Sequence, residues 1–105
     1  MSAKLFQILS REQGSPDGEM APIAARAQLL DDLARHNTAA ESEQQPDLLY
    51  GPGIRIELTP GEDPVKQMLL YITDEDIAWD VMIRLARQFK WRIHNPTGSQ
   101  PDLEP

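Results

Sequence analysis

The chain has 105 residues, no cysteine and a formal net charge of −7 at pH 7, a length that fits one domain with a modest core. The absence of cysteine excludes disulfides, thiolate zinc sites and thiol nucleophiles, and the acidic balance argues against broad capture of nucleic acid or anionic lipid. No secretory leader and no apolar run of membrane-spanning length is visible, so we expect a cytoplasmic protein without membrane association.

The first half of the chain predicts one strand and one helix. A short apolar run predicts a strand at Lys4–Ser10, and a polar break follows it. Pro22 suits the first position of a helix, and apolar side chains recur on one face as far as His36, which predicts a helix over Pro22–His36. Residues 38–47 are polar and lack a periodic apolar signal, so we expect a mobile connection there.

Two strands are predicted next. Over Gly53–Thr59 the apolar residues alternate with polar ones, which indicates a strand with one buried and one wet face. The segment Thr59–Pro64 combines proline, glycine and acidic residues and is typical of a reversal. The second strand, Val65–Thr73, contains the uninterrupted apolar run Met68–Ile72, as expected of a strand in the centre of a sheet.

A capped helix and a last strand complete the prediction. Acidic residues from Asp74 onward suit the start of a helix over Asp74–Lys90. Its predicted apolar stripe consists of Ile77, Ala78, Val81, Met82, Leu85, Ala86 and Phe89. Alternation then predicts a strand at Trp91–Asn95, and residues 96–105 are interpreted as a flexible tail.

The order of these elements predicts an α+β domain over residues 1–95, arranged as a ferredoxin-like βαββαβ two-layer sandwich. The alternative is a C-terminal ββαβ core with a helical or disordered N-terminal arm, residues 1–47. Neither arrangement by itself assigns a function, because this fold is reused for many.

Candidate interface residues lie on two predicted elements. Trp79 and Ile83 are one helical turn apart beside the main stripe, which widens the apolar surface beyond what one sheet should cover. A two-layer sandwich leaves one sheet face open, where Leu69 and Tyr71 would be wet. Both observations favour a protein partner or a homodimer. The simpler interpretation is that other segments of the chain cover these side chains.

A second candidate is an anion site. Between Val81 and Pro101 the chain has no acidic residue. The basic candidates, completed by Arg55 from an earlier strand, are Arg55, Arg84, Arg87, Arg92 and His94. Their pattern equally fits solvated positions of a helix and a strand. A deep pocket at Arg92 and His94 would indicate a small-ligand sensor or an enzyme, whereas a flat apolar patch would indicate association.

No motif predicts catalysis. The chain lacks a phosphate loop, a zinc pattern, an HExxH helix and a nucleophile elbow, so we expect no catalytic, cofactor-binding or metal-binding residues. RNA binding is the weaker alternative, because the outward positions of the predicted strands offer a single aromatic residue, Tyr71. Protein association, with a homodimer as one form of it, is the function we expect.

Overall fold

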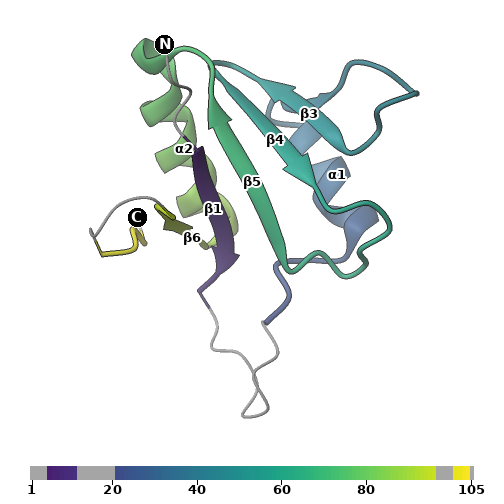
Figure 1. Cartoon of the computed structure of the whole chain (residues 1–105), viewed down its shortest axis with the longest axis horizontal. Helices are drawn as coiled ribbons and strands as arrows, with labels where there is room; N and C mark the ends of the chain where they lie inside the picture. Colours follow the sequence, from purple (N-terminus) through teal and green to yellow (C-terminus); the bar gives the residue numbers. More distant parts are fainter. Residues whose placement is uncertain (1–4, 12–20, 97–100, 105) are drawn as a thin grey trace.

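Six antiparallel strands form one sheet in the computed structural model, which describes residues 5–11, 21–96 and 101–104, and both helices lie on the same face of that sheet (Figure 1). The elements are β1 Leu5–Ser10, α1 Arg26–Ala34, β2 Ala39–Ala40, β3 Leu48–Gly51, β4 Ile54–Leu58, β5 Gln67–Ile72, α2 Glu75–Phe89 and β6 Trp91–His94. The strand order is β2-β3-β4-β5-β1-β6. Neither helix is long and apolar enough to cross a membrane.

The α+β class is confirmed, and the finer arrangement is not. The four predicted strands are consecutive in the sheet as β4, β5, β1 and β6, but β3 and β2 extend it beyond β4. This six-strand order is not the usual order of a ferredoxin-like sandwich. The alternative with a separate N-terminal arm is wrong, because β1 lies between β5 and β6 and places Phe6 and Ile8 in the core.

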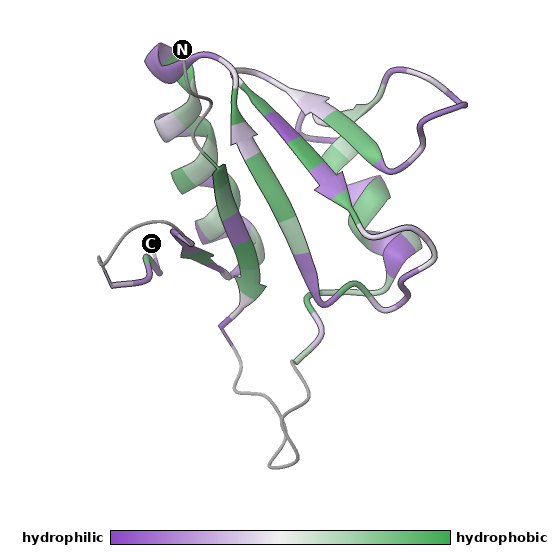
Figure 2. Ribbon diagram, in the orientation of Figure 1, coloured by the Kyte–Doolittle hydropathy of each residue, from purple (hydrophilic) through white to green (hydrophobic). Residues whose placement is uncertain are grey.

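The core lies between the sheet and the helices. Alternate strand residues point into it, and Figure 2 shows the corresponding alternation of hydrophobic and hydrophilic residues along β4. Helix α2 contributes Ala78, Met82, Leu85 and Ala86, and α1 contributes Leu29 and Leu33. Since full burial of one such large side chain stabilises by about 1.5–3 kcal/mol, this single cluster is the main stabilising feature of the fold.

Helix α2 follows the predicted phase with one correction. The Asp74 side chain caps its start by accepting a hydrogen bond from the backbone N–H of Asp76, at 3.0 Å, and Lys90 ends it in a left-handed conformation. Ile77, predicted in the buried stripe, is 44% exposed. It lies in the first helical turn, beside the β3–β4 turn at Gly53 instead of over the sheet.

Helix α1 is shorter than predicted and is tied to distant loops by Arg26. The predicted start at Pro22 lies four residues before the observed one, and Ile23 and Ala24 instead pair with Val65 through backbone hydrogen bonds. The Arg26 guanidinium donates to the backbone oxygens of Thr59 and Glu62, at 3.0 and 3.2 Å, and forms an ion pair with Asp47. Arg26 therefore connects α1 to two separate loops.

Two segments predicted to lack regular structure contain sheet contacts. Residues 38–47 include β2, which pairs with β3 through Ala39↔Tyr50 and Ala40↔Leu49. In the predicted tail, Leu103 forms an antiparallel bridge with Ile93 of β6, while residues 97–100 and 105 lie outside the described part of the chain. The mobility of both segments remains a prediction.

Candidate functional site

The sheet face opposite the helices is the surface that we call the open face. Residues paired across antiparallel strands point to the same side, so the strand register defines its members. They are Ala39 of β2, Leu48 and Tyr50 of β3, Arg55 and Glu57 of β4, Gln67, Leu69 and Tyr71 of β5, Leu5, Gln7 and Leu9 of β1, and Arg92 and His94 of β6. Except for Ala39, Leu69 and Glu57, which are exposed, all of them are half-buried.

Two cross-strand rows carry the apolar and aromatic groups of the open face. One runs through Leu5, Tyr71, Arg55 and Tyr50, and the other through Gln7, Leu69, Glu57 and Leu48. The prediction of a single aromatic residue here is wrong, because the unpredicted strand β3 adds Tyr50. These rows place large side chains together on a surface that neither helix covers (Figure 1).

Within these rows, Arg55 is held by stacking. Its guanidinium carbon lies 4.4 Å from the centroid of the Tyr71 ring, a cation–π geometry. Its Nε atom is buried and has no hydrogen-bond partner. Two residues along the same strand, Glu57 points to the same side, so the centre of the open face carries one charge of each sign.

Arg92 and His94 meet a carboxylate from a segment distant from β6. The Nδ1 atom of His94 lies 2.7 Å from Oδ1 of Asp102, and Nε of Arg92 lies 3.3 Å from Oδ2 of the same side chain. Because Leu103 is paired with Ile93, the neighbouring Asp102 falls opposite His94. The two basic residues therefore contact an anionic group of their own chain.

The predicted anion set does not form one site. Arg55 lies on β4 and is separated from β6 by β5 and β1, which is about 14 Å at the usual strand spacing. Arg84 and Arg87 are exposed on α2, which packs on the other face of the sheet. Only Arg92 and His94 come together.

The predicted interface residues also separate onto two surfaces. Leu69 is 36% exposed at the centre of the open face. Trp79, on α2, is 37% exposed, and its ring lies edge-on to that of Phe6 with the centroids 5.4 Å apart. Ile83 is half-buried on the same helix. Trp79 thus has a contact within the fold that the sequence did not reveal.

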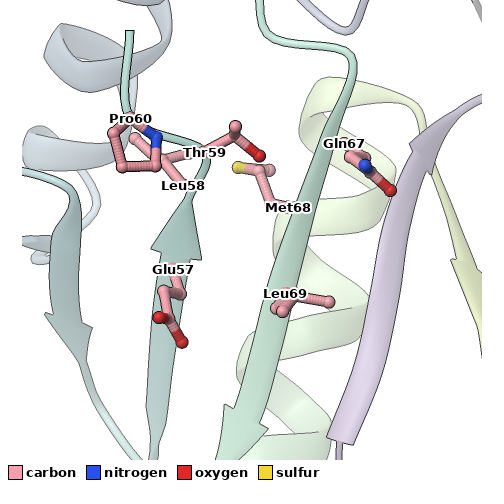
Figure 3. Close-up of a pocket in the computed structure, with 7 residues that line it drawn as sticks. All are labelled: Glu57, Leu58, Thr59, Pro60, Gln67, Met68 and Leu69. Atoms are coloured by element: carbon pink, nitrogen blue, oxygen red, sulfur yellow. The ribbon is translucent and has the colours of Figure 1, made fainter. Parts of the chain in front are cut away.

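Two shallow pockets, each of about 250 Å³, lie on opposite sides of the molecule. The first is on the open face where β4 and β5 lead into their connecting loop, and Figure 3 shows Glu57 and Leu69 among its lining side chains. The second lies between the end of α1 and α2, where Arg35, His36 and Arg84 are near one another. Neither of these two pockets is lined by Arg92 or His94.

Within residues 5–11, 21–96 and 101–104, no three His, Asp or Glu side chains are grouped so that they could hold a metal ion. No protein-family model, curated protein or solved structure matches the chain. The candidate site therefore rests on the geometry of this structure.

Sequence reasoning missed Tyr50, Leu48 and Asp102 as members of the site. A signal for β3 was present, because Leu48, Leu49 and Tyr50 precede a Pro52-Gly53 turn and the alternating strand β4. Nothing local marks Asp102, whose role depends on where residues 101–104 lie relative to β6.

Proposed function

We propose that this protein works by protein–protein association, and that the open face contacts a second copy of the chain. The observation that supports the proposal is the set of aromatic and aliphatic side chains in the two central rows, which includes Tyr71, Tyr50 and Leu69. Tyrosine is enriched at interfaces because its ring is large and its hydroxyl tolerates water.

The charges on the open face favour a second copy as the partner. Arg55 and Glu57 are two residues apart on one side of β4, about 7 Å along the strand. A two-fold axis between them brings each arginine against the glutamate of the other copy, as an isologous interface requires. The centre of the open face carries one charge of each sign, whereas the whole chain carries −7. Two acidic copies can therefore approach each other there without adding like charges to the contact.

The size of the sheet predicts a weak dimer. Six strands at about 4.8 Å spacing and about 17 Å length give a footprint of roughly 400–500 Å². Stable complexes bury about 800 Å² per partner, so this area places the contact among weak associations. We expect a dissociation constant on the order of micromolar or weaker.

Sedimentation velocity between about 5 and 500 µM, a range chosen to bracket a micromolar constant, tests the proposal. The wild type should change from monomer to dimer as the concentration rises. Leu69→Lys should remain monomeric, because Leu69 lies beside the proposed two-fold axis and a lysine there would bury a charge in the contact between the two copies. As a comparison on the other candidate surface, Trp79→Gln combined with Ile83→Ser should still dimerise. Far-UV circular dichroism controls for the fold. A wild type that stays monomeric refutes self-association, and dimer loss only in the helix variant moves the interface to α2.

A second candidate function, recognition of an anionic group at Arg92 and His94, is supported by one observation. Both side chains already contact the Asp102 carboxylate, at 3.3 and 2.7 Å. The Arg92 contact is an ion pair, and His94 forms a hydrogen bond to the carboxylate, which is stronger than one between neutral groups. Titration with acetate and with phosphate, followed by NMR of the His94 ring, should show displacement of Asp102 if small anions are the ligands.

We also infer that β1, α1, β4, β5, α2 and β6 form a ferredoxin-like unit, extended at one edge by β3 and β2. In chain order these six elements read βαββαβ. Because Ala39 pairs with Tyr50, the ends of the added segment are adjacent. Replacing residues 39–51 by a short Gly-Ser linker should therefore leave a cooperatively unfolding domain, and loss of cooperativity would contradict the inference.

A further inference from the structure

Within the part of the chain that the structure describes, the outer edge of β6 is only partly paired. On the inner side β6 pairs with β1. On the outer side the Trp91 carbonyl accepts a hydrogen bond from Nε of Arg11, at 2.9 Å, and Ile93 exchanges two backbone bonds with Leu103, at 2.8 and 2.9 Å. The outer edge of a strand is a template for another extended segment. Here the outward-facing N–H and C=O groups of Ile93 are already bonded to Leu103, in the segment 101–104.

The side chains on either side of Ile93 favour a negatively charged partner strand. On the open face Arg92 and His94 flank the position, and the segment presents Asp102 to both of them. The pattern basic–apolar–basic in Arg92-Ile93-His94 thus faces acidic–apolar–acidic in Asp102-Leu103-Glu104. Since opposite charges across paired strands are favourable, this edge discriminates in favour of an acidic strand.

The segment that fills the edge is held weakly. All four residues from Pro101 to Glu104 are exposed, and Leu103 keeps 43% of its surface accessible. Apart from the two backbone bonds and the Asp102 contacts, it therefore buries little apolar surface. Few buried contacts and exposed backbone bonds are the marks of a segment that opens locally at small cost.

We propose that the edge of β6, with Arg92 and His94, is a binding site for an extended acidic peptide that adds to the sheet as an antiparallel strand, and that residues 101–104 are its internal competitor. The required ligand has a carboxylate one residue before the residue that pairs with Ile93. Backbone bonding supplies pairing, and the carboxylate supplies selectivity. The proposal does not depend on the dimer, because the pairing occurs at the sheet edge.

The test is an NMR titration of the full chain with an unlabelled peptide that has the sequence of residues 99–105. The variant Asp102→Asn with Leu103→Pro opens the edge, since it removes the carboxylate and the N–H that bonds to the Ile93 oxygen. Both positions are exposed, so the fold should persist. If the closed form outnumbers the open form by about ten to one, the wild type should bind the peptide about tenfold more weakly than this variant.

Three controls identify the site. Arg92→Gln with His94→Gln, added to the opened variant, should lose at least about tenfold in affinity, as should a peptide with asparagine in place of its aspartate. The matched charge control Asp80→Asn, an exposed acid on α2, should behave as the wild type. The amide of Ile93 should be among the signals that shift.

Two outcomes overturn the proposal. One is an opened variant whose Ile93 amide does not respond to the peptide. The other is equally strong binding of the asparagine peptide, which would mean that the edge of β6 pairs with any extended peptide and does not select for a carboxylate. Sedimentation of the same variants measures dimerisation separately. Failure of the peptide to bind would therefore not bear on the proposed self-association.

Discussion

Replacing Gly53 by alanine should destabilise the fold more than the same change at Gly61, although both glycines have positive φ, 72° and 74°. A side chain in the left-handed region costs about 1–2 kcal/mol, and the stiffer unfolded chain offsets about 0.4–1 kcal/mol of that. At Gly61 nothing lies within 4 Å of an added Cβ. The net loss there should be about 1 kcal/mol.

Gly53 carries an additional steric cost. An added Cβ would lie 2.9 Å from the backbone oxygen of Asp74 and 3.0 Å from the backbone nitrogen of Ala78, both at the start of α2. These are backbone atoms, so the helix itself must shift, and overpacking of this kind costs about 1–3 kcal/mol. The total loss at Gly53 should be about 2–4 kcal/mol.

Urea denaturation followed by circular dichroism measures both free energies of unfolding, with an unchanged dependence on urea as the sign of an intact two-state transition. The quantity that matters is the difference between the two variants, because the conformational term is common to both. Equal losses at Gly53 and Gly61 would refute the reasoning that α2 is packed directly against the β3–β4 turn.

Two further measurements address the helix phase and the long connection. Leu85→Ala should lower the free energy of unfolding by about 2–5 kcal/mol and Arg84→Ala by less than about 0.5 kcal/mol. The reason is that Leu85 is 2% exposed in the core, whereas Arg84 is exposed. Similar losses for the two variants would mean that the buried face of α2 is misassigned. Residues 41–46 should show lower backbone NMR order parameters than α2, because none of them is buried or lies in a strand or helix, and equal values would contradict this.

The elements with a periodic apolar pattern were predictable from the sequence. Helix α2 begins and ends within one residue of its predicted bounds, and β4 and β6 show the expected alternation of buried and more exposed residues. Local pattern suffices there because one face of each element meets one core. The side that Arg55 occupies was likewise deducible from the alternation in β4, whereas the side of Tyr71 follows from its pairing with Arg55.

The remaining features depend on contacts that local pattern does not encode. Strand β3 has only four residues and follows a polar segment, so the turn at Pro52-Gly53 marks it but its apolar residues are too few to show a period. The exposure of Ile77 depends on where α2 begins relative to the sheet, and the separation of Arg55 from Arg92 depends on strand order. The position of Asp102 depends on a bridge formed by Leu103, outside the predicted strands.

The contacts of Arg26 have a consequence for the cooperativity of the loops. One guanidinium joins the first residue of α1 to the loop after β4 and to Asp47 before β3, and the Arg26 N–H also donates to the Asp63 carboxylate, at 3.0 Å. Loops that are separate in sequence therefore share one set of hydrogen bonds. Their amides should exchange with solvent as a single subglobal unit instead of independently, so a change at Arg26 would be felt in all three segments at once.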